Sequence, residues 1–373
     1  MPKPLEGIRV VELARVLAGP WCGQLLADLG AEVVKVERPG AGDDTREWGP
    51  PFVTGADGEA LGAAYYHSCN RGKLSVAIDI ASPKGQAEVR ALLADADVVI
   101  ENYKVGGLVK YGLDPARLRA DFPRLVVCSI TGFGQTGPYA HRAGYDYIVQ
   151  AMSGFMSLTG EPDGAPQKAG IAYADIFTGM YSAVAILAAL RRRDVTNMGA
   201  HVDMALLDSQ VAVLANQAAN YLASGVAPKR MGNAHAIVVP YQVFATADGQ
   251  LVIAVGNDGQ YRKLCAVLGV PEWGDDPRFA NNAMRLANRA ELVPLLAAKI
   301  AAWDAQPLSL VLEAEGVPAG PINDLAQVFA DPQVIARGMR FRPAGASIDG
   351  VASPIVIDGE RMVSPSGAPP LGG

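Results

Sequence analysis

The sequence predicts an α/β protein built on a parallel sheet with helices on both faces. In its first third, short apolar runs alternate with helical stretches, and strand–helix–strand repetition of this kind is typical of parallel sheets. Half of the 373 residues are hydrophobic, which suits a packed enzyme and argues against disorder. Because right-handed crossovers place the loops that follow the strands at one edge, we expect a Rossmann-like large domain that binds its ligand there.

Strands of this domain are expected at residues 8–13, 32–37, 98–100, 124–130 and 202–207. Helices are expected at 20–29, 84–93 and 176–193. The last of these is the clearest, because Ile176, Met180 and Val184 fall on one apolar stripe. A long Ala-rich helix is expected after the final strand, ending near Gly225.

The pattern changes after Gly225. Two apolar runs flank Ala247-Asp248-Gly249, which is a strong hairpin signal. We expect strands at 241–246 and 251–255, helices at 261–268, 288–303 and 308–315, and a breaker-rich link at 317–321. The chain is therefore divided into a large domain, a small α+β domain and a C-terminal segment, at residues 1–225, 226–330 and 331–373.

Composition argues against several classes of protein. The net charge of −6 provides no basic field for nucleic acid or an anionic membrane. The N-terminus lacks the apolar region of a signal peptide, and no uncharged apolar run is long enough to span a bilayer, so we expect a soluble cytoplasmic protein. The four cysteines are far apart, which predicts buried free thiols and no metal or disulfide framework.

Asp175 is the most informative residue of the chain. It lies among small and apolar neighbours, directly before the predicted helix 176–193. One interpretation is an N-cap, whose oxygen accepts the free backbone N–H groups of the first turn. The other is a nucleophile, because the positive helix end favours the anion and the small neighbours leave room for an acyl group.

Several basic residues lie near the ends of predicted strands, and the nucleotide motifs are missing. There is no GxxxxGK[ST] loop, and the GxGxxG match at 132–137 runs into Pro138 instead of a helix, which indicates a turn. No GxSxG elbow accompanies the four histidines, and none of them has metal-ligand spacing. Each basic residue alone is typical of a surface charge, but together they would suit a polyanionic ligand such as a nucleotide phosphate: Arg38, Arg71, Lys73, Lys104, Lys110 and Arg142.

Ordered motifs along the whole chain resemble the family III CoA-transferases of the CaiB/BaiF type, which include formyl-CoA transferase and carnitine CoA-transferase. The matching segments are 4–10 (PLEGIRV), 18–20 (AGP), 30–37 (GAEVVKVE), 70–73 (NRGK), 97–103 (DVVIENY), 144–146 (GYD) and the Asp175 segment. The resemblance implies a Rossmann-like domain, an interlocked dimer of ring-shaped chains, and a C-terminal segment that returns to the large domain. It also implies a CoA thioester as substrate, with no tightly bound cofactor.

The resemblance assigns roles residue by residue. Asp175 matches the family's nucleophilic aspartate. Positions that line the CoA site or its acyl end correspond to Val16, Arg38, Lys73, Asn102, Tyr103, Lys110, Tyr111 and Tyr145, and we add Arg142 from the basic set. The segment Gly256-Asn257-Asp258-Gly259 corresponds to a glycine-rich loop that closes over the active site in some members, although it holds fewer glycines here.

Two substitutions narrow the activity. Formyl-CoA transferases have a glutamine at the position of Leu17, and leucine cannot donate the same hydrogen bond to the acyl group. The related α-methylacyl-CoA racemases use a histidine at the position of Tyr145, and a tyrosine is a poor base at neutral pH. The first difference argues against formyl or oxalyl specificity. The second favours CoA transfer over racemisation, with a racemase or a non-catalytic CoA-binding protein as the alternatives.

The implied reaction passes CoA from an acyl-CoA donor to a carboxylic acid through an aspartyl anhydride and an aspartyl-CoA thioester. The segment Arg230-Met231-Gly232-Asn233 resembles members that use succinyl-CoA and a dicarboxylic acid. A second carboxylate would need a cationic partner, for which we consider Arg71, Arg230 and His235.

Overall fold

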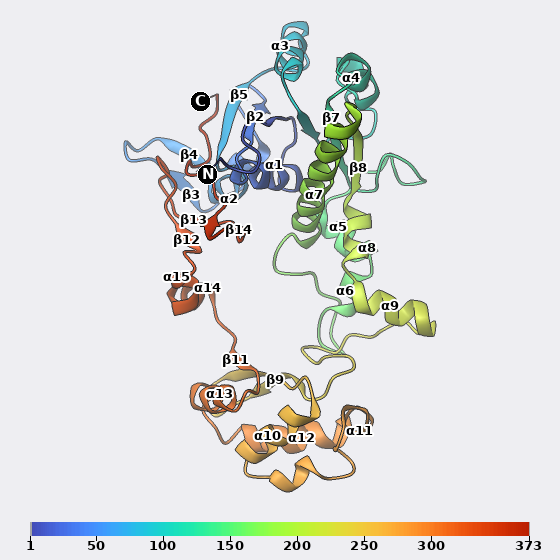
Figure 1. Ribbon diagram of the computed structural model, residues 1–373, viewed down its shortest axis with the longest axis vertical. Coiled ribbons are helices and arrows are strands. Elements are labelled where there is room, and N and C mark those ends of the chain that lie inside the picture. Colours follow the sequence, from blue (N-terminus) through green and yellow to red (C-terminus); the bar gives the residue numbers. More distant parts are fainter. Residues whose placement is uncertain (1, 373) are drawn as a thin grey trace. The chain divides into compact units, whose positions relative to one another are not determined.

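A computed structural model describes residues 2–372. The chain forms two compact units (Figure 1). The first contains the residues up to Met156, then Lys168–Ala227, and the chain from Pro332 onward. The second contains Ser157–Gln167 and Pro228–Asp331, so a short segment from within the range expected for the large domain packs with the second unit.

The first unit is built on a six-stranded parallel sheet, as the sequence predicts. Its strands, in the order in which they pair, are β5 (Lys73–Ala77), β2 (Glu32–Glu37), β1 (Arg9–Glu12), β6 (Val98–Glu101), β7 (Val126–Thr131) and β8 (His201–Ala205). The strand order reverses between β1 and β6, and open α/β sheets bind ligands beyond the carboxyl ends of the strands at such a point. β5 was not expected, because Asn70-Arg71-Gly72-Lys73 was interpreted as a loop.

Helices cover both faces of this sheet because successive strand residues point to opposite sides. On one face, α1 (Ala18–Asp28) and α7 (Tyr173–Thr196) pack on Val10, Val98 and Val126. On the other face, α3 (Pro83–Ala94) and α4 (Pro115–Asp121) pack on Val11, Val99 and Val127. The strands are therefore buried on both sides, which explains their nearly continuous apolar sequences.

Helix α7 begins three residues earlier than expected, at Tyr173, and has 24 residues. Its length and composition would suffice to cross a membrane. In this fold it is packed instead against α1, and Ala183, Ile186 and Leu190 lie in the core of the sheet domain. It therefore serves as a central helix of the first unit (Figure 1).

Shorter elements complete the first unit. They are η1 (Asp44–Arg46), β3 (Phe52–Thr54), β4 (Ala60–Ala63), α2 (Ala64–Cys69), η2 (Val109–Tyr111), α5 (Asp146–Met152), α8 (Leu206–Ala212) and α9 (Ala215–Ser224), while α6 (Phe155–Leu158) lies where the chain enters the second unit. The Ala-rich helix is thus two helices, with Ala215 at a φ of 44° at the break between them.

The second unit is an antiparallel sheet covered by helices. Its strands pair in the order β11 (Ala319–Pro321), β10 (Gln250–Ala254) and β9 (Tyr241–Ala245). Its helices are α10 (Asp258–Val267), η3 (Pro271–Gly274), α11 (Asn282–Ala287), α12 (Arg289–Ile300), α13 (Ala305–Ala314) and α14 (Leu325–Ala330). The hairpin around Asp248 is confirmed, whereas β11 lies in the stretch interpreted as a link.

The C-terminal segment packs back on the first unit. It contains α15 (Pro332–Ala336), β12 (Arg340–Phe341), β13 (Gly350–Val351), β14 (Val356–Ile357) and β15 (Glu360–Arg361). Asp28 on α1 accepts a hydrogen bond of 2.8 Å from the backbone N–H of Ser364 and pairs with the buried Arg71, which donates to the carbonyl of Val351. The return of this segment is therefore stabilised by a buried ion pair.

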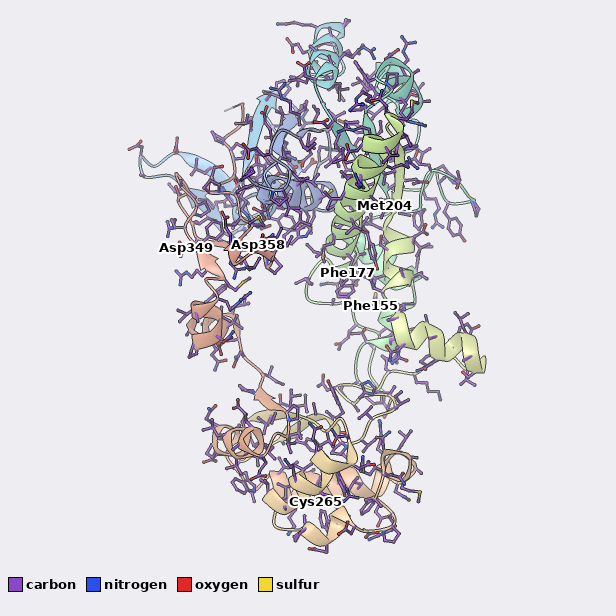
Figure 2. The ribbon with its side chains drawn as sticks, in the orientation of Figure 1. Phe155, Phe177, Met204, Cys265, Asp349 and Asp358 are labelled. Carbon is purple, nitrogen blue, oxygen red and sulfur yellow. The ribbon has the colours of Figure 1, made fainter. Side chains whose placement is uncertain are left out.

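All four cysteines are buried and free, as their spacing predicts. Burial raises the pKa of Cys22 well above its ordinary value. Cys265 lies in the core of the second unit (Figure 2). Their role in this fold is packing.

Candidate functional site

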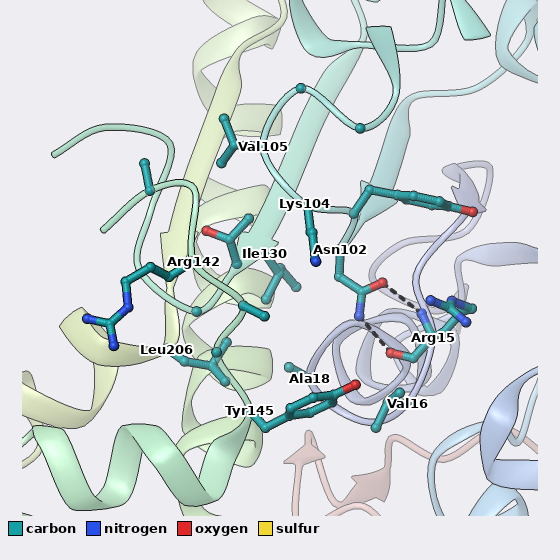
Figure 3. A pocket seen from close by; sticks show the side chains of 18 of the residues that line it. Arg15, Val16, Ala18, Asn102, Lys104, Val105, Ile130, Arg142, Tyr145 and Leu206 are labelled. Atoms are coloured by element: carbon teal, nitrogen blue, oxygen red, sulfur yellow. Dashed lines mark hydrogen bonds between the residues drawn. The ribbon is translucent and has the colours of Figure 1, made fainter. Parts of the chain in front are cut away.

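A cavity of about 940 Å³ opens at the point where the strand order of the first unit reverses (Figure 3). Its wall is formed by the loops after β1, β6 and β7, by the first turn of α7 and by Leu206. Nine residues expected from the sequence to form the site line it together: Val16, Leu17, Asn102, Tyr103, Lys110, Tyr111, Arg142, Tyr145 and Asp175.

Asp175 is not the N-cap of α7. The helix begins at Tyr173, and the N-cap residue is Ala172, whose side chain accepts no hydrogen bond. Asp146 performs the capping function instead, because its Oδ1 accepts from the backbone N–H of Ala174 at 2.7 Å and of Asp175 at 3.3 Å. The Asp175 carboxylate is therefore left free at the positive end of the helix.

Asp146 itself is held by Gln150, which lies one turn further along α5. The buried Gln150 donates to Asp146 Oδ2 at 2.7 Å and accepts from the backbone N–H of Ala169 at 2.9 Å. An aromatic stack fixes the same region, with ring centroids 5.0 Å apart between Phe155 and Tyr173 and 4.6 Å between Tyr173 and Phe177 (Figure 2). The chain before the nucleophile candidate is thus anchored on α5.

Burial and the neighbouring Asp146 carboxylate raise the pKa of Asp175 to about 7. Both causes act against a negative charge, because the side chain loses water and gains a like charge. A carboxylate with so high a pKa is a stronger nucleophile in its ionised form and is still substantially ionised at neutral pH.

Tyr65 on α2 is a neighbour of this carboxylate that sequence reasoning missed. Burial and the Asp175 charge raise the pKa of Tyr65 well above its ordinary value, so its hydroxyl remains a hydrogen-bond donor. The edge of its ring packs on Trp48, with centroids 5.6 Å apart. No local motif in Ala64-Tyr65-Tyr66-His67 indicates that this tyrosine is affected by the Asp175 charge.

Arg38 lines a second cavity of about 270 Å³, which shares Arg15, Tyr103 and Tyr111 with the larger one. In the larger cavity, the Lys110 Nζ atom lies 4.7 Å from the ring centroid of Tyr111. The Arg142 Cζ atom lies 4.6 Å from the ring centroid of Tyr139. The cationic groups are thus spread over both cavities and held by aromatic contacts.

Two expected site residues have structural roles instead. Lys73 is completely buried, and its ammonium group donates to Glu12, to the carbonyl of Pro20 and to Asn70. All three of its donors are therefore occupied, and it cannot contact CoA. Arg71 is occupied by Asp28 and by a backbone carbonyl, so it is not available to a substrate carboxylate.

The remaining expected residues belong to the second unit. Asn257 caps α10 by accepting from Gln260 N, and Gly256 N donates to the Gln260 side chain, so the Gly256-Asn257-Asp258-Gly259 segment is an ordered helix start. Arg230 donates to the carbonyls of Glu161 and Gly164. His235 accepts at Nδ1 from the backbone of Ile237 and Val238.

Comparison with known proteins identifies the family. The chain matches the model of CoA-transferase family III over residues 5–373. This protein belongs to that family. It is 58% identical to the succinate–glutarate CoA-transferase of Agrobacterium fabrum, with 99% of this chain and 93% of the relative covered. It is 46% identical to the succinyl-CoA:glutarate CoA-transferase of Mus musculus, with 99% and 84% covered.

A solved structure supports the same conclusion. The crystal structure of a CAIB/BAIF family protein from Brucella suis is 56% identical to this CoA-transferase, with a TM-score of 0.90 and coverage of 100% of this chain and 97% of that one. The resemblance inferred from the motifs is therefore confirmed. CoA thioesters are the substrates of such transferases, and the cavity at the sheet edge is the place to expect them.

Proposed function

We propose that this CoA-transferase carries CoA from succinyl-CoA to a dicarboxylic acid, with glutarate as the first acceptor to test. The printed names of the two relatives at 58% and 46% identity support this donor and this acceptor. Leucine at position 17 supports an acyl group that needs no side-chain donor there. The observation that carries the mechanism is the uncapped Asp175 carboxylate in the wall of the cavity.

The proposed reaction has two symmetrical halves. The Asp175 carboxylate attacks the thioester carbonyl of succinyl-CoA, giving a mixed anhydride and the CoA thiolate. The thiolate attacks the aspartyl carbonyl, which releases succinate and leaves an aspartyl-CoA thioester. The acceptor carboxylate attacks this thioester and forms a second anhydride, and the thiolate then attacks the acceptor's acyl carbonyl. The products are the new acyl-CoA and a regenerated Asp175 carboxylate.

The surroundings of Asp175 suit this sequence of steps. Each half needs an ionised carboxylate but no general base, which agrees with a cavity whose lining, in the described part of the chain, contains no histidine. Asp146 keeps the backbone of α7 capped whether or not the Asp175 side chain is acylated.

We assign CoA to the two adjoining cavities of the first unit. Tyr103 and Tyr111, which line both, would contact the adenosine half, and cationic side chains would meet the phosphates. The proposed phosphate partners are Arg38, Lys110 and Arg142. Val16, Leu17 and Tyr145 would line the pantetheine and acyl end.

Residues of the second unit are proposed for the acceptor. Arg230 is the cationic candidate for its distal carboxylate, and His235 is a candidate only as a neutral donor through Nε2, because its Nδ1 accepts two backbone N–H bonds. Gly256-Asn257-Asp258-Gly259 is the candidate for a closing segment. Separate Arg230→Ala and His235→Ala variants should raise the KM for the dicarboxylic acid and leave the KM for a monocarboxylic acid unchanged if the proposal holds.

We also propose an interlocked homodimer in the cytoplasm, as the family resemblance implies. Large apolar side chains are exposed on the isolated chain and would be covered by a second copy. They include Tyr147, Ile148, Met152, Val184, Tyr221 and Leu222. Light scattering coupled to gel filtration should give twice the mass of the chain.

The decisive experiment follows oxygen atoms. Glutarate labelled with ¹⁸O in its carboxylates should transfer one labelled oxygen to Asp175 in each turnover. Because either carboxylate oxygen can attack succinyl-CoA, the label should then appear in the released succinate over the following turnovers. Mass spectrometry of succinate and of the peptide containing Asp175 would detect both. Unlabelled succinate from an active enzyme would exclude the anhydride route.

Two further outcomes separate the alternatives. Asp175→Ala and Asp175→Asn should bind CoA but lose turnover, and near-normal turnover of Asp175→Ala would refute the nucleophile assignment. Exchange of deuterium from solvent into Cα of a 2-methylacyl-CoA without any acceptor would instead indicate a racemase.

A further inference from the structure

Val16, in the wall of the cavity, has a backbone conformation that valine rarely adopts. Its φ is 72°, in the left-handed region, where a β-branched residue is a genuine outlier. The residue lies between the end of β1 and the start of α1, and Leu17 and Ala18 after it also line the cavity. Such strain persists only where surrounding contacts hold the backbone in place.

Asn102, at the end of the neighbouring strand β6, provides the first of these contacts. Its Oδ1 accepts from the backbone N–H of Arg15 at 3.0 Å, and its Nδ2 donates to the carbonyl of Arg15 at 2.7 Å (Figure 3). The Asn102 amide therefore forms hydrogen bonds with both the backbone N–H and the carbonyl of Arg15, the residue before Val16. Its hydrogen-bonding capacity is directed at the loop, whereas the family resemblance suggests CoA as its partner.

Asp43 holds the other side of the strained residue. The backbone N–H of Val16 lies 3.3 Å from each oxygen of the Asp43 carboxylate. Burial alone would raise the pKa of Asp43, but the adjacent Lys35 ammonium lowers it below its ordinary value, so the carboxylate stays charged. A charged acceptor makes the stronger hydrogen bond.

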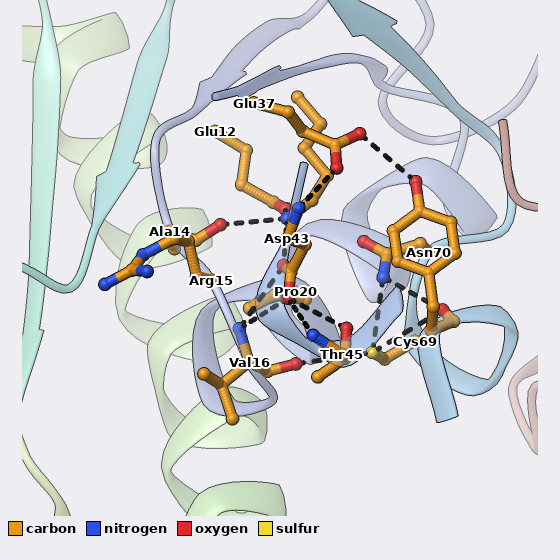
Figure 4. A network of polar contacts seen from close by, with 12 residues as sticks. Glu12, Ala14, Arg15, Val16, Pro20, Glu37, Asp43, Thr45, Cys69 and Asn70 are labelled. Carbon is orange, nitrogen blue, oxygen red and sulfur yellow. Dashed lines mark hydrogen bonds and ion pairs between the residues drawn. The ribbon is translucent and has the colours of Figure 1, made fainter. Parts of the chain in front are cut away.

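A buried network of two positive and two negative side chains fixes Asp43 and the loop together (Figure 4). Lys35 lies 2.8 Å from Asp43 and 2.9 Å from Glu12, and it donates to the carbonyl of Ala14. Lys73 pairs with Glu12 and donates to the carbonyl of Pro20. The backbone on both sides of Val16 is thus bonded to the same network.

We propose that Asn102 and Asp43 are positioning residues that hold Val16 in its left-handed conformation. The loop then keeps the cavity wall at a fixed position relative to Asp175. The inference rests on the proposed function, in that the wall would set the approach of the thioester carbonyl to Asp175. Misplacing a reacting group by about 1 Å can reduce the rate on the order of a hundredfold. Neither residue needs to contact CoA through its side chain.

A double-mutant cycle tests this assignment. Asn102→Ala should lower kcat on the order of a hundredfold, with a smaller rise in the KM for acyl-CoA. Adding Val16→Gly should restore at least a tenth of the lost rate, because glycine adopts a φ near +70° without the hydrogen bonds from Asn102. We call these hydrogen bonds and those of Asp43 to Val16 the clamp. A side chain that only contacted CoA would give a higher KM with unchanged kcat and no restoration, and that result would overturn the proposal.

Asn197→Gly is the matched control. Asn197 has a φ of 58° and follows the last residue of α7, so this variant introduces glycine at a left-handed position far from the cavity. Asn197→Gly should not restore the kcat of the Asn102→Ala enzyme. If Asn197→Gly and Val16→Gly both restored it, the proposed clamp at Val16 would be refuted.

The shift in the urea unfolding midpoint provides a second readout that does not need turnover. Under the proposal, the shifts of Asn102→Ala and Val16→Gly do not add, whereas independent effects would add and would contradict it. If Asp175→Ala retained activity while the midpoint shifts stayed coupled, the proposed function would fail and the clamp would stand.

Discussion

At the scale of single residues, the site depends on two carboxylates with different roles. Asp146 accepts the N–H groups that begin α7, and this frees Asp175 for the cavity. Had Asp175 capped its own helix, its oxygens would be engaged and its pKa lowered by those hydrogen bonds. Instead, burial and Asp146 raise the pKa to about 7. Asp146 therefore both positions the proposed nucleophile and raises its pKa.

Activity should depend on pH through this group. In the free enzyme, kcat/KM is expected to rise with pH and to reach half of its plateau near pH 7, because the ionised form attacks. Asp146→Asn keeps an oxygen for the helix cap but removes the like charge, so the midpoint should move to lower pH. Burial, the larger cause, remains, and the shift should be partial.

Asp194→Asn, in the last turns of the same helix, should leave this midpoint unchanged. A lower plateau in Asp146→Asn with the midpoint still near pH 7 would mean that Asp146 acts on structure alone. The profile is measured with subsaturating acyl-CoA over the range in which the fold is intact.

The free energy of unfolding should fall as pH rises, whereas kcat/KM should rise. The pKa of Asp175 is higher in the folded chain than in the unfolded chain, so the folded state retains a proton that the unfolded state loses. The free energy of unfolding attributable to this group therefore falls as pH rises from about 4 to about 7. Urea unfolding of Asp175→Asn should show a gain over the wild-type protein that is larger at pH 8 than at pH 5. An equal gain at both values would contradict the raised pKa.

At the scale of elements, α1 and α7 meet through small residues. A Cβ on Gly179 would lie 2.7 Å from the carbonyl oxygen of Ala18 and 3.1 Å from the Trp21 side chain. Gly179 lies one turn after Asp175 and inside the helix, where it permits the close packing of α1 on α7. The approach of α1 is what brings Leu17 and Ala18 to the cavity.

Gly179→Ala should destabilise this contact. Alanine gains up to about 1 kcal/mol in helix propensity, but the clash with a backbone oxygen costs about 1–3 kcal/mol and should dominate. We expect a lower urea midpoint and reduced kcat, since α1 must shift at the cavity. Gly170→Ala is the control, because a Cβ there meets nothing within 4 Å and the effect should stay within about 0.5 kcal/mol.

At the scale of the whole molecule, the chain leaves the first unit, forms the second and returns. The return is bonded to α1 and to the loop before β5 through Asp28, Arg71 and Ser364. The backbone N–H of Gly72, which lies within hydrogen-bond distance of the carbonyls of Ser366 and Gly367, adds to it. The cavity wall at the start of α1 and the end of the chain are therefore attached to the same helix.

Asp28→Asn should weaken this attachment. Removing the charge leaves the Arg71 guanidinium buried and uncompensated, which costs about 3–5 kcal/mol. Limited proteolysis should then cut within the C-terminal segment sooner. Asp349→Asn breaks ion pairs with the more exposed Arg340 and Arg342 in that segment (Figure 2) and should cost less than about 1 kcal/mol. Equal proteolysis of the two variants would argue against the buried pair.

The sequence by itself determined the parallel sheet, the hairpin of the second unit, the family and nine of the residues that line the cavity. These follow from local patterns: apolar periodicity, turn residues such as Asp248, and motifs at strand ends such as Asn102-Tyr103. Strand β5 and the break at Ala215 were missed, because in β5 the pattern is carried by pairing with β2 and not by a long apolar run.

Only the tertiary structure decided which carboxylate caps α7, which cations are free and why Val16 is strained. Asp146 and Asp43 reach their partners from other elements, and Lys73 and Arg71 are occupied by buried acids that no local spacing reveals. A carboxylate's role depends on the atoms that surround it after folding. Those atoms come from distant parts of the chain, so side-chain type and spacing alone cannot specify its hydrogen bonds or its pKa.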